Sequence, residues 1–258
     1  MKDPLGDRMK SSYENRTKLA LPRRTYTLIR IDGKAFHTYT RGLDKPYDDT
    51  FLRHMQQTAK YLCENVQGCK LGYVQSDEIS LLLTDFATPQ TNAWFDGDQQ
   101  KIVSISASMA TAYFNFLRPA ELPAKLALFD SRAWTIPDVV EVENYFIWRQ
   151  KDATRNSISL TAQAYFSPKQ LHGKSSNECQ EMLWKEKGLN WNDMDPCFKR
   201  GTVCVPRVRW GDHTYFDNRT QDFVTVGVER SVWELEAPPI FTTDDGRAFL
   251  KDLVPIPS

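Results

Sequence analysis

The chain has 258 residues, which is long enough for one large domain or for a core domain with a substantial addition. Its 33 lysine and arginine residues balance its 33 aspartate and glutamate residues, so no overall positive charge attracts nucleic acid, and any such contact must be local. The polar N-terminus and the lack of any run near the ~18 apolar residues of a membrane helix predict a soluble, cytoplasmic protein without a membrane partner, and five cysteines without a Cys-x-x-Cys pair argue against a zinc ribbon or a disulfide framework.

The first predicted elements are a strand and a helix. Residues 24–31 alternate in polarity and are rich in β-formers, which predicts a strand that ends at the Asp-Gly pair beginning with Asp32. Residues 48–66 have apolar side chains at every third or fourth position, which predicts an amphipathic helix. Either Asp48 or Asp49 can cap its first turn.

A hairpin, a second helix and another strand follow. Two short β-like runs, residues 70–74 and 79–83, flank a bend that contains Asp77. Residues 101–117 predict a helix that stops before a proline, and residues 126–134 predict a strand. The expected apolar face of this helix consists of Ile102, Ile105, Met109, Ala112 and Phe116.

The order β-α-β-β-α-β predicts an α+β protein with a ferredoxin-like palm core, in which two helices cover one face of an antiparallel sheet. The rest of the chain predicts two helices and two short strands, at residues 141–166, 180–187, 203–208 and 223–228. We therefore expect a catalytic core at residues 1–135. Residues 136–258 should pack on it as C-terminal helices and strands, and together the two parts should form one structural unit.

Two carboxylates far apart in the sequence are the main candidates for a site. The predicted topology places Asp32, at the end of the first strand, beside Asp77 in the neighbouring hairpin. With a backbone carbonyl such as that of Gly33, they would offer the oxygen ligands that magnesium prefers, and two such ions can clamp the attacking and leaving oxygens of phosphoryl transfer. Lys45 lies just before the helix, where it can bind triphosphate oxygens. The alternative is that both aspartates are ordinary turn residues.

Six segments form an ordered set at characteristic spacings. They read L-G-D-R-M-K at residues 5–10, R-I-D-G-K-A-F-H at 30–37, K-P at 45–46, Y-V-Q-S-D-E-I-S at 73–80, F-D-S-R-A-W at 129–134 and N-Y-F-I-W-R-Q-K-D-A-T-R-N-S at 144–157. Together they resemble the tRNA-His guanylyltransferase superfamily, and within it the bacterial and archaeal guanylyltransferase-like proteins.

The resemblance implies a nucleotidyltransferase that extends RNA in the 3′-to-5′ direction. The tRNA 5′ end is first activated, by adenylylation with ATP or as an existing triphosphate, and the 3′-OH of an incoming nucleotide then attacks the activated phosphate. The resemblance also implies two Mg²⁺ ions per site, ATP and GTP as substrates, and a homotetramer built as a dimer of dimers.

Individual roles follow from the same resemblance. Asp32 and Asp77 match the catalytic metal carboxylates, Gly33 matches the carbonyl ligand, and Glu78 matches a neighbouring acidic catalytic position that supports the ions. Expected nucleotide or triphosphate contacts are Lys34, Ala35, Phe36, His37, Lys45, Ser76 and Asn156. Expected RNA or phosphate contacts are Arg30, Arg149, Lys151 and Arg155, for the last three of which a solvated helix face is the alternative. The aromatic residues that could stack on a base, although core packing is the alternative, are Tyr145, Phe146 and Trp148.

One departure from the family separates two activities. Enzymes that add a single guanosine to tRNA-His resemble each other in the stretch H-I-N-N-L-Y-N, whereas this chain reads T-R-N-S-I-S-L at residues 154–160. The departure favours template-dependent repair of 5′-truncated tRNA over addition of a single 5′ guanosine. A nucleotidyl cyclase or conventional palm polymerase, and a non-catalytic RNA-binding module, are the further alternatives.

Overall fold

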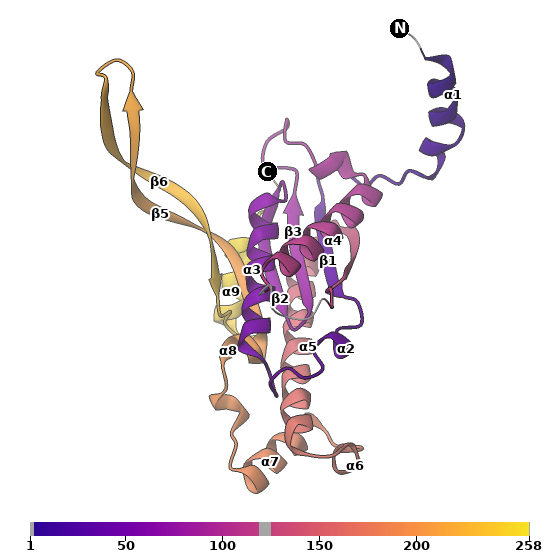
Figure 1. Ribbon diagram of the computed structural model, residues 1–258, viewed down its shortest axis with the longest axis vertical. Coiled ribbons are helices and arrows are strands. Elements are labelled where there is room, and N and C mark those ends of the chain that lie inside the picture. Colours follow the sequence, from indigo (N-terminus) through magenta and orange to yellow (C-terminus); the bar gives the residue numbers. More distant parts are fainter. Residues whose placement is uncertain (1–2, 119–124, 258) are drawn as a thin grey trace.

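The computed structural model describes residues 3–118 and 125–257 and is built around an antiparallel sheet of six strands in the order β4-β1-β3-β2-β5-β6 (Figure 1). The strands are β1 (Tyr26–Gly33), β2 (Cys69–Gln75), β3 (Glu78–Thr84), β4 (Phe129–Ile136), β5 (Thr202–Asp217) and β6 (Asp222–Glu236). The elements from β1 to β4 follow the predicted β-α-β-β-α-β order, so the α+β class and the ferredoxin-like core are confirmed.

Two helices cover one face of the sheet, as predicted. They are α3 (Asp49–Asn65) and α4 (Gln99–Phe116), and they pack on inward residues of the sheet such as Ile29, Leu81 and Ala133. The backbone N–H of Phe51 donates to Asp48 Oδ1 over 2.8 Å, so Asp48 is the N-cap of α3.

The predicted apolar face of α4 is wrong in part. Ile102 is buried and Met109 is partly buried, but Ile105, Ala112 and Phe116 are exposed. The helix instead buries a stripe that includes the small residues Ser106 and Ala110, which lets it approach the sheet closely. The Ser106 hydroxyl lies 2.8 Å from that of Ser131 on β4, so a polar contact replaces part of the expected apolar one.

The C-terminal part of the chain covers the other face of the sheet. The 27-residue helix α5 (Val139–Tyr165) and the shorter α9 (Asp244–Leu253) pack there, on residues such as Leu28 and Leu82. The C-terminal half of α5 continues past the sheet and packs on α7 (Ser176–Lys187). The remaining helices are short or stand apart, namely α1 (Pro4–Ser12), α2 (Phe36–Tyr39), α6 (Pro168–Leu171) and α8 (Pro196–Arg200), with 3₁₀ turns at Glu14–Thr17, Trp94–Gly97 and Trp191–Asp193.

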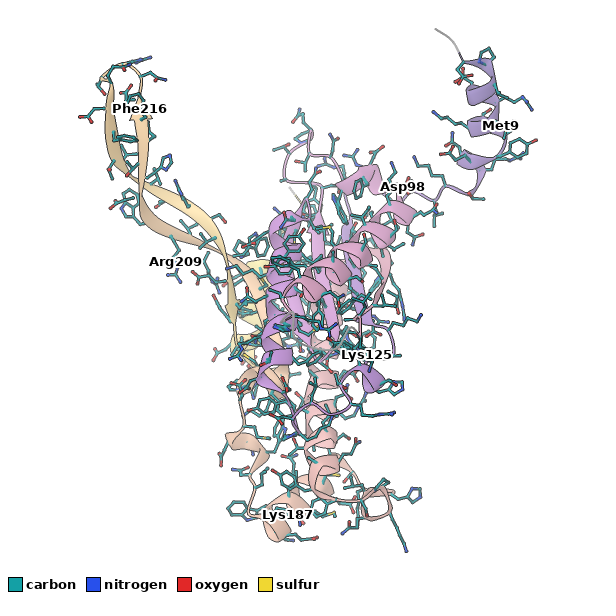
Figure 2. All side chains as sticks on the ribbon, in the orientation of Figure 1. Met9, Asp98, Lys125, Lys187, Arg209 and Phe216 are labelled. Carbon is teal, nitrogen blue, oxygen red and sulfur yellow. The ribbon has the colours of Figure 1, made fainter. Side chains whose placement is uncertain are left out.

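The last two strands are much longer than predicted. β5 has 16 residues and β6 has 15, whereas the sequence indicated short strands at residues 203–208 and 223–228. β5 pairs with β2 only at its start, and beyond this both strands continue together as an arm, residues 206–233, that extends away from the body (Figure 1) and ends near Phe216 (Figure 2). Most side chains of the arm are exposed on both faces, so its strands lack the alternating pattern that reveals a half-buried strand.

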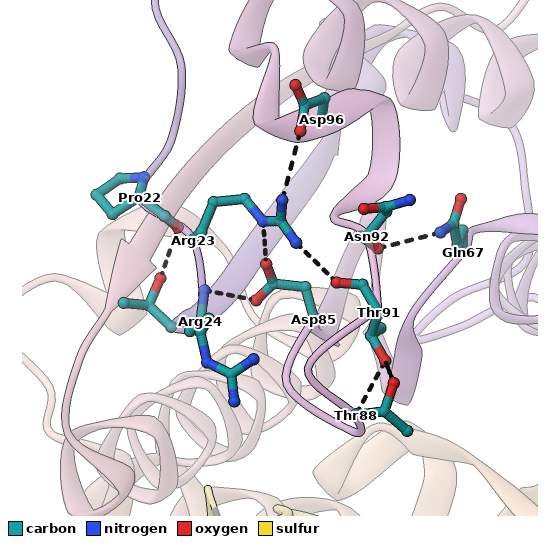
Figure 3. Close-up of polar contacts among 10 residues, drawn as sticks. Pro22, Arg23, Arg24, Gln67, Asp85, Thr88, Thr91, Asn92 and Asp96 are labelled. Carbon is teal, nitrogen blue, oxygen red and sulfur yellow. Dashed lines mark hydrogen bonds and ion pairs between the residues drawn. The ribbon is translucent and has the colours of Figure 1, made fainter.

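A polar cluster ties the start of β1 to the segment that follows β3 (Figure 3). Buried Asp85 accepts hydrogen bonds of 2.7 Å from Arg23 Nε and from the backbone N–H of Arg24. Arg23 also donates to the carbonyl of Thr91 over 2.7 Å. Because β1 and β3 are neighbours, this cluster helps to fix their register, which at the opposite end of the same strand pair positions the carboxylates described next.

None of the helices within the described ranges is both long and apolar enough to cross a membrane.

Candidate active site

The structure brings Asp32 and Asp77 to one cavity. Asp32 on β1 lies opposite Glu78 on β3, and the next residue, Gly33, donates its N–H to the carbonyl of Asp77 over 3.1 Å. Asp77 belongs to the two-residue turn between β2 and β3, where Ser76 adopts a positive φ of 49°. Both aspartates line a cavity of about 370 Å³. The two aspartates therefore lie together, as the predicted topology required, and their chemical roles remain predictions.

The two carboxylates of the cavity favour a bound cation. Burial, and then the negative charge of Asp32, raise the pKa of Asp77 to about 6. A divalent ion beside both carboxylates would offset the repulsion that the charge of Asp32 exerts on Asp77. In the part of the chain that the structure describes, no group of three or more His, Cys, Asp or Glu side chains could hold a metal, so further ligands must be carbonyls, water or substrate. That mixed oxygen set fits magnesium, with the Gly33 carbonyl as the nearest backbone candidate.

Gly33 is required at its position by close packing. A Cβ added there would lie 2.3 Å from the ring of Phe36, which is itself only 3% exposed. The Phe36 ring packs in a cluster of aromatic residues, with ring centroids 5.0 Å from Phe129 and 6.0 Å from Phe114. Phe36, predicted as a nucleotide contact, therefore lines the cavity of the aspartates with a ring that packs in the core.

The other residues of this turn are more accessible. Ala35 and His37, which are predicted nucleotide contacts, are exposed and line the same cavity as the aspartates. Lys34 is also exposed, and its backbone N–H donates to the carbonyl of Leu128 over 2.8 Å. The turn after β1 is thus anchored through its backbone, which leaves these side chains available to a substrate.

A second cavity, of about 120 Å³, adjoins the first. Lys45, Ser76 and Asn156, the expected triphosphate contacts, all line it, although they come from three separate segments of the chain. The two cavities have four lining residues in common, namely Thr40, Phe51, Ser76 and Leu160. A nucleotide that bound along both could therefore place its phosphates between Lys45 and the aspartates.

The structure adds aromatic residues that the sequence did not single out. Tyr47 and Phe198 line the second cavity, and their rings stack with centroids 4.4 Å apart. Tyr47 follows the Lys45-Pro46 pair, so its place in the motif was a signal. Phe198 comes from the turn-rich C-terminal region, and nothing in the sequence pointed to it.

Glu78 and Arg149 form a buried ion pair behind the aspartates. Arg149 Nε and Nη2 each donate to a Glu78 carboxylate oxygen over 2.7 Å, and both residues are less than 10% exposed. Burial raises the pKa of Glu78, and the charge of Arg149 opposes that rise. Arg149 was expected to contact phosphate or to lie on a solvated helix face. The solvated helix face is wrong, because Glu78 holds the guanidinium inside the protein, and the phosphate contact stays a prediction.

The remaining basic candidates lie in different environments. Arg30 is on β1, two residues before Asp32, and its Nε lies 4.0 Å from Glu78 Oε2. Lys151 and Arg155 are exposed on α5, where Arg155 pairs with Asp152. Of the three aromatic residues on the same helix, Tyr145 and Phe146 are buried in the core, whereas Trp148 is 51% exposed.

Comparisons with known proteins point to one enzyme family. The sequence model of the tRNAHis guanylyltransferase family matches residues 6–137. The solved structure of a bacterial tRNA(His) guanylyltransferase-like protein in complex with ATP is 42% identical, with a TM-score of 0.83 over 97% of this chain and 99% of that one. A structure of such a bacterial protein in complex with GTP is 40% identical, with a TM-score of 0.78 over 98% of this chain and 100% of that one. The tRNA(His) guanylyltransferase of Debaryomyces hansenii is 31% identical over 70% of this chain and 73% of its own length.

Proposed function

The chain belongs to the tRNAHis guanylyltransferase family and is a nucleotidyltransferase, and from this premise we propose that it adds nucleotides to tRNA 5′ ends in the 3′-to-5′ direction with Mg²⁺. One observation carries the proposal: Asp32 and Asp77 share a cavity that continues into the one lined by Lys45 and Ser76. Phosphoryl transfer depends mainly on positioning and charge neutralisation, and this arrangement offers both.

Different residues of the chain would bind the nucleotide and the metal ions. Lys45, Ser76 and Asn156 bind the triphosphate of the incoming nucleotide, and ATP and GTP in the solved relatives support such a site. Asp32, Asp77 and the Gly33 carbonyl would hold magnesium, which would supply charge neutralisation at the reacting phosphate. The 3′-oxygen of the nucleotide then forms a bond to the activated 5′ phosphorus of the RNA, and AMP or pyrophosphate leaves.

Template-dependent repair of 5′-truncated tRNA is the activity that we propose within this chemistry. The T-R-N-S-I-S-L stretch supports it, because it departs from the H-I-N-N-L-Y-N stretch of the enzymes that add a single guanosine. The similarity to the bacterial guanylyltransferase-like proteins also supports it, since that similarity extends over nearly the whole chain. The second candidate is the activity named for the fungal relative, addition of guanosine to tRNA-His.

A single experiment separates the two activities. The protein is incubated with Mg²⁺, all four nucleotides and a labelled tRNA, either 5′-truncated or full length, with each possible base opposite the growing end. Repair predicts extension of the truncated tRNA only, by the nucleotide complementary to the opposing base. Asp77→Ala should abolish the product, while Asp130→Ala, on the neighbouring strand but 57% exposed, should not. One guanosine added to full-length tRNA-His whatever base lies opposite would contradict repair.

We also propose that the protein assembles as a homotetramer. Large apolar side chains are exposed along the arm, among them Trp210, Phe223 and Val208 at 71%, 70% and 68%. Exposed apolar surface of this kind is common at protein–protein contacts. Light scattering coupled to gel filtration tests the proposal, which a monomeric mass at micromolar concentration would contradict.

A further inference from the structure

One large aromatic side chain of α5 lies outside the core. Trp148 is 51% exposed, although the residues on either side of it are buried. Lys151 and Arg155 are also exposed, and their spacing from Trp148 places them on the same face of the helix. Arg155 pairs there with Asp152. An aromatic ring beside basic side chains is the combination with which proteins hold single-stranded nucleic acid, because the ring stacks on a base while the cations lie near the backbone.

The indole of Trp148 is ordered by its neighbours. The guanidinium carbon of Arg149 lies 4.5 Å from the ring centroid, and so covers one face of the indole. That guanidinium is itself fixed by two hydrogen bonds of 2.7 Å to Glu78. The ring of Tyr145 packs against the indole at 69°, with centroids 6.0 Å apart. Because about half of the side chain stays exposed, a flat group can stack on a ring that is already ordered, which lowers the entropic cost of binding.

Trp148 lies next to the reaction site but outside its cavities. Glu78, which holds Arg149, is paired with Asp32 across β1 and β3. In the other direction along α5, Asn156 of the second cavity is about 12 Å away, at a rise of about 1.5 Å per residue. Among the described residues, Trp148 lines neither the second cavity nor that of the aspartates. It is therefore near enough to contact an RNA whose 5′ end reaches Asp32, without belonging to the space that a nucleotide would fill.

We propose that Trp148 stacks on the first unpaired base of the RNA strand opposite the truncated 5′ end, and so positions the base that directs nucleotide addition. The inference rests on the proposed function, because a 5′ truncation leaves bases of the opposing strand without partners. Unpaired bases are the ones that proteins bind by aromatic stacking. Stacking uses the face of the base and leaves its pairing edge free for the incoming nucleotide.

The surroundings of Trp148 favour RNA over two other occupants. The base of the nucleotide substrate has aromatic neighbours of its own in the second cavity, which Tyr47 and Phe198 line. A second copy of the chain would bury an apolar patch, whereas the exposed residues one turn from Trp148 are the polar Asn144 and Lys151. Binding measurements distinguish these three occupants.

The test compares two RNAs and two tryptophans. Hairpins of the tRNA acceptor stem are made with a blunt end or with the single-stranded 3′ overhang that a 5′ truncation leaves, and their affinities are measured without nucleotides. Trp148→Leu keeps an apolar cover over Arg149 but removes the aromatic face, and Trp148→Phe keeps a ring. Trp184→Leu is the control, because this indole is 61% exposed on α7, at one end of the molecule (Figure 1). A fluorescent adenine analogue at the first unpaired position reports stacking through its quenching, and thermal unfolding verifies that each variant is folded.

The proposal predicts that Trp148→Leu binds the overhang RNA about tenfold more weakly than the wild type does, which is the usual contribution of stacking on one base. The blunt RNA should bind equally well to both proteins, because it has no unpaired base to lose. Quenching of the analogue should disappear in Trp148→Leu and persist in Trp148→Phe and in Trp184→Leu.

Four results would overturn the proposal. They are an equal loss of affinity for both RNAs, unchanged quenching in Trp148→Leu, a loss of affinity for GTP alone, and a mass in light scattering that differs from that of the wild type. Because binding is measured without catalysis, wild-type protein that fails to extend 5′-truncated tRNA would count against the proposed function. Extension by the wild type, together with equal binding of the overhang RNA by Trp148→Leu, would count against the role of Trp148 alone.

Discussion

Replacing one active-site carboxylate should stabilise the metal-free protein. An aspartate whose pKa is held at about 6 instead of 3.8 costs the folded chain about 3 kcal/mol at neutral pH, because each tenfold change in proton affinity is worth about 1.4 kcal/mol. The causes are burial and the charge of Asp32, and Asp77→Asn removes the charge on which both act. We therefore expect this variant to gain about 2–3 kcal/mol of unfolding free energy in EDTA at pH 7.5, or about 5–10 °C in melting temperature.

The pH dependence of this gain has a fixed sign. The folded protein binds the Asp77 proton more tightly than the unfolded chain does, so the penalty is absent below the unfolded pKa. It grows as the pH rises from about 4 to about 6 and is constant above. The difference between Asp77→Asn and the wild type should therefore be large at pH 7.5 and near zero at pH 4.

Urea unfolding in EDTA at the two pH values measures the effect, and a matched substitution provides its control. Asp85 is also a buried aspartate, but it is held by Arg23 and by the backbone N–H of Arg24. Asp85→Asn should therefore destabilise the protein, by about 2–4 kcal/mol, where the same change at Asp77 stabilises it. The reasoning is refuted if Asp77→Asn is no more stable than the wild type at pH 7.5 without metal.

Three further experiments test other parts of the site. Arg149→Met should cost about 3–5 kcal/mol in urea unfolding, because it removes both hydrogen bonds from the buried Glu78 carboxylate and leaves it the longer contact with Arg30. Glu78→Leu in the same chain should recover most of this loss, and a double variant as unstable as the single one would contradict the account. Gly33→Ala should lower stability by about 1–3 kcal/mol and slow nucleotide addition, because its Cβ would overlap the Phe36 ring; an unchanged melting temperature and rate would be inconsistent with that clash. Lys45→Ala should raise the KM for the nucleotide about tenfold in steady-state assays by removing a phosphate contact, which an unaltered KM would rule out.

The sequence predicted the core of the fold because each element there buries one face. The period of the helix after Asp48 and the two short runs around Asp77 arise from packing on the sheet, so their positions could be read to within a few residues. The same pattern placed Asp32 beside Asp77, since antiparallel neighbours bring strand ends and bends together. The length of the arm was not predicted, because its strands pair mainly with each other and leave both faces exposed.

Parts of the site depend on contacts that local sequence does not specify. Arg149 belongs to a segment rich in charged and polar residues, and only the fold shows that it reaches back to Glu78 on β3. Phe198 meets Tyr47 across the second cavity, from an element that is far away in the chain. Such pairings depend on how α5 and the C-terminal segments pack against the sheet, which periodicity does not specify.

The central claim is that Asp32 and Asp77 jointly hold the divalent ions of the reaction. The most direct measurement is a titration with Mn²⁺, a paramagnetic substitute for Mg²⁺, followed by electron paramagnetic resonance in the presence of a non-hydrolysable nucleotide. We predict two bound ions per chain for the wild type, and weaker binding of at least one of them for Asp32→Asn and for Asp77→Asn. Asp130→Asn, which changes an exposed carboxylate directly opposite Asp32 on β4, should bind as the wild type does. Wild-type binding by both active-site variants would contradict the claim.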